Sequence, residues 1–179
     1  MATNRGKQFE DHVRESFEKV PGVSIDRLHD QTNGFKGSQN ICDFIVYKKP
    51  HEYYFECKSV HGNTLSIHSV PKPDKKGVLH GFYGNITDTQ WEGLLKKSKI
   101  KGVKAGVICW WVDKDVTSFI PIQFLQLLKT QGHKSIRYDF CESLQNMEEM
   151  QVYKIYQING KKKRVFFDYD MEEFLCSLC

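Results

Sequence analysis

Apolar residues near the start of the chain recur at the spacing of a helix that buries one face. The stripe is formed by Phe9, Val13, Phe17 and Val20, at intervals of four, four and three residues. This periodicity predicts an amphipathic helix over residues 6–20. The Pro21-Gly22 pair predicts the end of that helix, because neither residue favours its continuation.

The following segments contain strand-forming runs and one clear helix start. Runs rich in Phe, Ile, Val and Tyr predict strands over 23–28, 41–47 and 52–58, with the residues KKPH as the turn between the last two. Thr87-Asp-Thr-Gln90 matches a capping box and predicts a helix over 87–99. The near-continuous apolar run 103–112 predicts a strand that is buried on both faces.

Weaker patterns cover the rest of the chain. Residues 29–40 are expected to form a polar loop, and residues 59–85 a long irregular segment of the kind that is often functional. The further elements expected are a short strand over 117–120, a helix from Pro121 to Lys129, a helix over 141–150, a hairpin of 152–158 and 164–167 that turns at Asn159-Gly160, and a short C-terminal helix. No repeat or linker interrupts the chain, which favours a single domain over 1–179.

Composition and charge narrow the class of protein. The 179 residues are 40% hydrophobic and 13% aromatic, which is enough to build a core. The net charge of +4 permits a nucleic-acid partner without requiring one. We find no run of about 18 apolar residues and no secretion signal, so we expect no membrane span, a cytoplasmic location and reduced cysteines. The C-x-x-C pair, Cys176 and Cys179, is interpreted as a helix end rather than a metal or redox site.

Charged residues stand at the ends of the predicted hairpin, which reads CDFIVYKKPHEYYFECK over residues 42–58. Side chains alternate faces along a strand, so Glu56 and Lys58 point the same way and Cys57 points to the other face. Antiparallel pairing is expected to bring Asp43 beside Glu56. Two such carboxylates repel unless a cation lies between them, and Mg²⁺ binds through one or two carboxylates. The alternative is an exposed Glu56–Lys58 ion pair, with Asp43 capping a turn.

The pattern D-(x)12-E-x-K on a hairpin resembles the active-site signature of the PD-(D/E)XK nucleases. The core of that superfamily has the order helix, three strands, helix, strand, which is the order predicted above. The segments NRGKQFEDHV and IDRLHDQT are in addition similar to RecU-type Holliday junction resolvases. This resemblance covers residues 4–125 and is weak beyond them. Two features depart from it: C-D replaces P-D, and the segment after Lys58 is longer and more basic.

The resemblance implies an α/β, restriction-endonuclease-like fold, with a central mixed sheet flanked by helices and an αβββαβ core. The chain would be one nuclease domain with its core over 4–125 and a helix and hairpin extension over 126–179. Asp43, Glu56 and the Cys57 backbone carbonyl would hold Mg²⁺ or Mn²⁺, and Lys58 would be the catalytic lysine. Glu10 would be an additional acidic residue, unless it is an ordinary solvated helix glutamate. Gln90 would lie near the site as well as completing its capping box.

The activity implied by the resemblance is metal-dependent hydrolysis of DNA phosphodiesters in four-way junctions, with no small-molecule cofactor. A two-fold homodimer would cut the two opposed strands, in a bacterial cell or a phage-infected host cell. The alternatives are a restriction or repair endonuclease of the same superfamily, and a non-catalytic DNA-binding module.

DNA binding needs cations along the path of the phosphates. The candidates are Arg5, Lys7, Arg27, Lys36, Lys72, Lys75 and Lys76. The basic runs 96–104 and 161–164 either extend this path or simply keep the surface soluble. His61, His68 and His80 are expected to be solvated loop residues, although a histidine-assisted metal site is an alternative.

Overall fold

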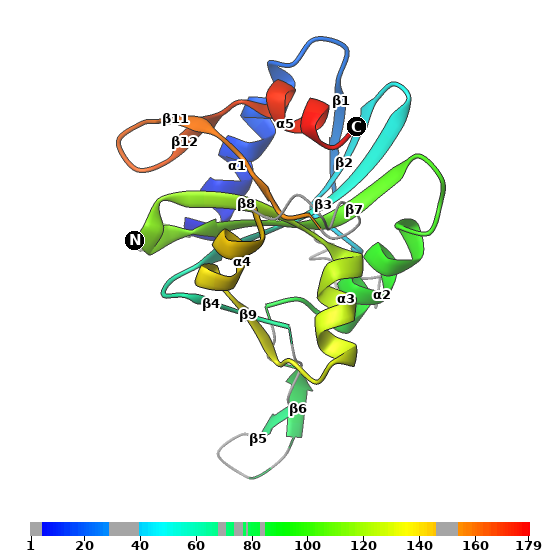
Figure 1. The fold of residues 1–179 in the computed structure, drawn as a ribbon, viewed down its shortest axis with the longest axis vertical. Coiled ribbons are helices and arrows are strands. Elements are labelled where there is room, and N and C mark those ends of the chain that lie inside the picture. Colours follow the sequence, from blue (N-terminus) through cyan, green and yellow to red (C-terminus); the bar gives the residue numbers. More distant parts are fainter. Residues whose placement is uncertain are drawn as a thin grey trace.

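Six strands form the central sheet of the computed structural model (Figure 1). The structure describes residues 5–28, 40–67, 71–73, 77, 79–82, 85–145 and 154–179. In the order β1-β2-β3-β7-β8-β10, the strands are Ser24–Arg27, Phe44–Lys48, His51–Val60, Val103–Trp111, Val116–Pro121 and Tyr156–Gln157. β3 and β7 run parallel and the other neighbours run antiparallel, so the sheet is mixed, as predicted.

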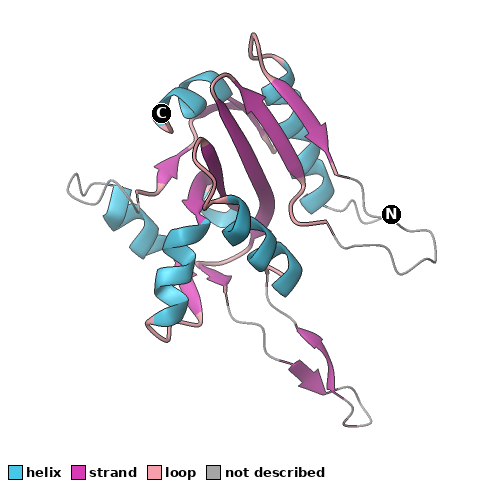
Figure 2. Ribbon diagram, turned by 90° about the vertical axis from the view of Figure 1, so that its right-hand side faces the viewer, coloured by secondary structure: helices cyan, strands magenta, loops and turns pink. Residues whose placement is uncertain are grey.

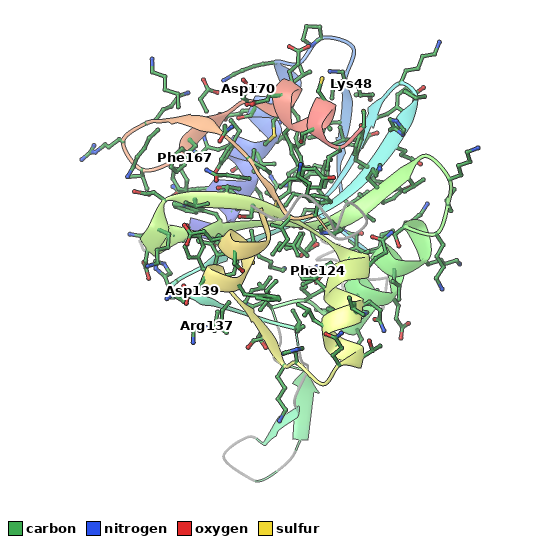
Figure 3. All side chains as sticks on the ribbon, in the orientation of Figure 1. Lys48, Phe124, Arg137, Asp139, Phe167 and Asp170 are labelled. Carbon is green, nitrogen blue, oxygen red and sulfur yellow. The ribbon has the colours of Figure 1, made fainter. Side chains whose placement is uncertain are left out.

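Helices cover both faces of this sheet (Figures 1 and 2). α1 (Arg5–Glu18) and α5 (Met171–Ser177) pack on one face. α2 (Asp88–Lys97), α3 (Ile122–Thr130) and α4 (Tyr138–Gln145) pack on the other, and a 3-10 turn, η1 (Val112–Lys114), joins β7 to β8. Figure 3 shows Phe167 and Asp170 on the α1 side, and Phe124, Arg137 and Asp139 on the opposite side. None of the described helices is long and apolar enough to cross a membrane.

The predicted order of helix, three strands, helix and strand is confirmed by α1, β1 to β3, α2 and β7. The apolar stripe of α1 is buried, and β7 is buried on both faces from Ala105 onward. Alternate residues of β3 contribute to two separate cores. Tyr53, Phe55 and Cys57 face α1, whereas Tyr54 and Val60 face the α2 side. Glu56 therefore points toward the α2 side, because it is two residues beyond Tyr54.

The segment between β3 and α2 is more regular than its composition predicts. β4 (Thr64–Ser66) pairs with β9 (Ser135–Arg137), and β5 (Pro71–Pro73) pairs with β6 (Leu79–Phe82). The prediction of an irregular segment over 59–85 is therefore wrong at β4, β5 and β6. β4 finds its partner far along the chain, which no local pattern reveals. The predicted polar loop lies outside the described residues except for Asn40.

The predicted C-terminal hairpin is wrong in its pairing. β10 joins the central sheet beside β8, and Ile158 N–H donates a hydrogen bond to Thr117 O at 2.8 Å. The hairpin instead consists of β11 (Gly160–Lys162) and β12 (Phe167–Tyr169), so its turn is formed by residues 163–166. Gly160 belongs to β11 and not to a turn. A Cβ at this position would lie 2.8 Å from Asp168 O. The close approach of β12, and not a turn, requires this glycine.

The other late elements differ only at their ends. α3 begins one residue after Pro121, which is its N-cap and not its first helical residue. α4 begins at Tyr138, and residues 146–150 of the predicted helix lie outside the described part of the chain. The predicted C-terminal helix is confirmed as α5.

Gly106 allows β8 to approach β7 closely in the middle of the sheet. A Cβ at this position would lie 2.4 Å from Ile120 O and 2.7 Å from a ring carbon of Phe119, and both groups are buried. We therefore expect Gly106→Ala to lower the free energy of unfolding by about 3 kcal/mol in urea titrations. Gly132→Ala is the control, since its Cβ would meet nothing within 4 Å and only its φ of +86° opposes alanine. It should cost about 1 kcal/mol, and equal losses in the two variants would contradict the packing argument.

Candidate active site

The β2–β3 hairpin brings two carboxylates together, as its sequence predicts. Phe44 pairs with Phe55, so the preceding Asp43 stands opposite Glu56. The Asp43 N–H donates to Phe55 O at 3.1 Å, and Asp43 Oδ2 accepts a hydrogen bond from the Cys57 N–H at 2.7 Å. The main chain of β3 thus holds the Asp43 carboxylate beside the strand that carries Glu56 and Lys58.

Glu56 is a buried carboxyl group, with a relative exposure of 1%. Its Oε1 accepts a hydrogen bond from Gln90 Nε2 at 2.6 Å and pairs with Lys58 Nζ. Its Oε2 is buried and has no hydrogen-bond partner among the residues that the structure describes. A buried acceptor without a partner lowers the stability of a fold. Such an oxygen next to a second carboxylate is the arrangement expected of a cation ligand before the cation binds.

Burial shifts the pKa values of Glu56 and Lys58. Burial raises the pKa of Glu56 to about 8. The charge of Lys58 lowers this pKa, and the charge of Asp43 raises it further. Burial alone would lower the pKa of Lys58, but the Glu56 carboxylate outweighs it and the pKa is raised. Lys58 is therefore an ammonium at neutral pH, where Glu56 is still mostly protonated in the absence of a cation, and it lies near the Asp43 charge.

Glu10 approaches the site from α1 and is fixed by an arginine. Arg27 of β1 donates to Glu10 Oε2 at 2.5 Å and to Asp11 Oδ1 at 2.7 Å. Burial raises the pKa of Glu10, and the charge of Asp43 raises it further. Glu10 is therefore not a solvated helix glutamate, because it shares an electrostatic environment with Asp43. Asp11 was not predicted, since only the folded chain shows that Asp11 and Glu10, two of the four acids on α1, both pair with Arg27.

Gln90 has two functions at once, as expected. Its Oε1 accepts from the Thr87 N–H at 3.0 Å, and Thr87 Oγ1 accepts from the Gln90 N–H at 3.3 Å, which completes the capping box of α2. Its Nε2 donates to Glu56. One side chain therefore fixes the start of α2 and the orientation of the buried carboxyl group.

A Gln90→Glu variant separates these two functions. Glutamate keeps an oxygen for the Thr87 N–H but replaces the donor that faces Glu56 with a second acceptor. We expect thermal stability close to that of the wild type and a 10- to 100-fold loss of metal affinity or metal-dependent activity, which is about the usual effect of removing a group that orients a metal ligand. Gln90→Ala is the comparison, because it loses the cap as well and should melt at a lower temperature. Wild-type metal affinity in Gln90→Glu would contradict the orienting role.

The groups present suit a hard divalent ion that keeps several waters. Within the described ranges, no three His, Cys, Asp or Glu side chains are grouped as a preformed metal site. The oxygen donors available at the hairpin are the carboxylates of Asp43 and Glu56, with the Cys57 carbonyl between Glu56 and Lys58 in the strand. Mg²⁺ is commonly bound through one or two carboxylates together with water and substrate oxygens, so this small donor set fits it.

The other predicted residues are not gathered at this site. Arg5 and Lys7 are exposed on the first turn of α1. Lys36, Lys75, Lys76 and His68 lie outside the described residues, and so do the side chains of Lys72 and His80. Arg27 is used in ion pairs with Glu10 and Asp11, and its contact with DNA stays a prediction. His61 is exposed and contacts Asp113, while Cys176 and Cys179 are free and exposed at the end of α5.

Comparisons with known proteins give a likeness of fold. No family model and no curated protein matches the chain. Among solved structures, Hjc from Archaeoglobus fulgidus, described as a Holliday junction resolvase from an archaeal hyperthermophile, is similar with a TM-score of 0.44 and 18% identity. The match covers 66% of this chain and 78% of that one. A likeness at this level does not assign an activity.

Proposed function

We propose that this protein is a metal-dependent endonuclease that hydrolyses phosphodiesters in branched DNA. The observation that carries the proposal is the convergence of Asp43, Glu56 and Lys58 at one end of the β2–β3 hairpin, with a buried Glu56 oxygen that no described residue hydrogen-bonds. This combination supports hydrolysis because a cation and an ammonium can together stabilise the charge of a phosphoryl transition state.

Asp43, Glu56 and the Cys57 carbonyl would hold the ion, Mg²⁺ or Mn²⁺. When bound, a divalent ion of this kind polarises a phosphate oxygen and lowers the pKa of water. The protein itself supplies the remaining groups. Lys58 holds a positive charge beside the acids, where it can orient the attacking water or neutralise charge that develops on the phosphate. Arg27 holds Glu10, and Gln90 holds Glu56, so both acids keep one orientation.

The finer assignment is a Holliday junction resolvase of the RecU type. It is supported by the similarity of residues 4–125 to that family, including the helix that carries Glu10. A homodimer follows from the chemistry, because cutting two opposed strands needs two active sites in a fixed relation. The protein would act in the cytoplasm of a bacterial cell or of a phage-infected host.

The experiment that tests this function is cleavage of a synthetic four-way junction beside a linear duplex of matched sequence. We expect cleavage of the junction in Mg²⁺ or Mn²⁺, little cleavage of the duplex, and none of either in EDTA. Equal cleavage of both substrates would favour a restriction or repair endonuclease. Binding without cleavage at any metal concentration would favour a non-catalytic DNA-binding module.

A further inference from the structure

A stripe of one basic and two polar side chains lies on α1, on a flank of the helix that does not carry Glu10. Arg5, Gln8 and His12 share a stripe, since they are three and four residues apart. The turn of the β11–β12 hairpin packs against this stripe. Together they line a surface pocket of about 440 Å³, whose polar and aromatic groups come from Arg5, Gln8, His12, Lys163, Arg164 and Phe166.

The turn is held firmly although it protrudes. The Lys163 N–H donates to Phe166 O at 2.7 Å and closes the turn. The Phe166 ring packs against the His12 ring in a tilted arrangement, with centroids 4.6 Å apart, and also contacts Trp110 at 5.2 Å. Behind it, the Tyr169 N–H donates to Ser16 Oγ at 3.1 Å. The cations at the tip are therefore presented on a rigid support, which reduces the entropy lost when they bind a ligand.

The charges of this pocket suit an anion. Its lining contains no carboxylate, whereas the neighbouring pocket between α1, β12 and α5 includes Asp168, Asp170 and Glu172. In the described part of the chain, no ion pair joins Arg164 to an acid. Lys162 is paired with Asp115, and Lys163 lies 3.6 Å from Asp168. Of the basic run 161–164, only Lys163 and Arg164 line this pocket.

The position of the pocket relative to the candidate site suits a phosphate of duplex DNA. Glu10 and the pocket lie on different flanks of α1, so they are separated by about 10–12 Å, the diameter of an α-helix. The major groove of B-DNA is about 12 Å wide. A duplex arm that places one strand at Glu10 and Asp43 can therefore bring a phosphate of its other strand to this pocket.

We propose that the turn of residues 163–166, together with the first two turns of α1, binds the phosphate backbone of a DNA arm outside the candidate active site. This inference rests on the proposed function for the identity of the substrate. It gives the C-terminal extension a role, as an arm that holds the duplex and does not take part in the chemistry.

The test compares Arg164→Ala with Lys161→Ala in the full-length protein. Both changes remove one exposed cation from the same hairpin, but only Arg164 lines the pocket. Anisotropy of a fluorescein-labelled junction, and of a linear duplex, is measured in EDTA over a range of KCl concentrations. We expect Arg164→Ala to weaken binding of both DNAs about three- to tenfold and to reduce the salt slope by about one. Arg5→Ala should act in the same way, and Lys161→Ala should change affinity less than about twofold.

Two outcomes would overturn the inference: no effect of Arg164→Ala, or equal effects of Arg164→Ala and Lys161→Ala, which would indicate overall charge and not a site. Because binding is measured in EDTA, the result does not depend on cleavage. DNA binding that needs Arg164, in a protein that cleaves no junction, would support the arm and contradict the nuclease. Junction cleavage with equal effects of the two variants would support the nuclease and contradict the arm. Thermal unfolding of each variant at the wild-type temperature verifies that the fold is intact.

Discussion

Replacing Glu56 by glutamine is expected to abolish cleavage while leaving junction binding intact. The buried Oε2 has no hydrogen-bond partner in the described part of the chain, so it is the oxygen best placed to receive a cation. Glutamine preserves the shape of the side chain and an acceptor for Gln90 but removes the negative charge. Loss of several kcal/mol of transition-state stabilisation corresponds to a decrease of about 10³-fold in the cleavage rate. The measurement is single-turnover cleavage of a labelled four-way junction at saturating protein.

Lys58→Ala is expected to give a similar loss of cleavage, because it removes the only ammonium paired with Glu56 in the described structure. Both variants should bind the junction in EDTA as tightly as the wild type, since neither loses a contact with the duplex arms. The matched control is Glu52→Gln, which makes the same chemical change on the same strand and the same face, four residues before Glu56. Cleavage that persists in Glu56→Gln and Lys58→Ala would count decisively against this site.

A second large effect is expected in the pH dependence of folding stability without metal. The pKa of Glu56 is about 8 in the folded protein, against 4.5 for an exposed glutamate. Below about pH 4.5 the carboxyl is protonated in both states. As the pH rises further, the unfolded chain loses its proton first, so the free energy of unfolding falls until the folded pKa is passed. The pKa of Glu10 is also raised by burial and contributes in the same direction.

The decrease in the free energy of unfolding follows from the shift in the pKa of Glu56, at about 1.4 kcal/mol per pKa unit. It amounts to about a few kcal/mol between pH 5 and pH 8. Urea titrations in EDTA at several pH values measure it. Glu56→Gln should remove most of the slope and be more stable than the wild type at pH 8, while Glu52→Gln should keep the slope. Mg²⁺ should stabilise the wild type more at pH 8 than at pH 6, because the ion displaces the proton of Glu56. A flat stability profile for the wild type would contradict the assigned burial of this carboxyl group.

The sequence was sufficient to predict the central part of the fold and the candidate site because both depend on local patterns. Strand alternation places Glu56 and Lys58 on one face, and hairpin pairing brings Asp43 to them. The capping box of α2 is likewise a short motif that the structure confirms. Such features need only a few neighbouring residues, so they can be read without knowledge of the whole chain.

The features that were missed depend on contacts between distant segments. β4 pairs with β9, and β10 pairs with β8, neither of which is signalled by turn residues. Asn159-Gly160 has the composition of a hairpin turn, but the main chain there extends toward β8 and β12 instead. The interaction of Arg27 with Asp11 joins a strand to a helix in the same way. Tertiary packing therefore overrides local preference at these positions.

β3 is paired along both of its edges, with β2 and with β7, and its alternate side chains belong to a hydrophobic core and to the candidate site. A shift of this strand by one residue would exchange the two sets, moving Phe55 to the side of the candidate site and burying the charge of Lys58 in the core against α1. Selection for a well-packed core would thus preserve the register of the candidate site without acting on any activity. For an engineer, it follows that substrate preference is best altered in the peripheral hairpins, and that the central ribbon should be left as it is.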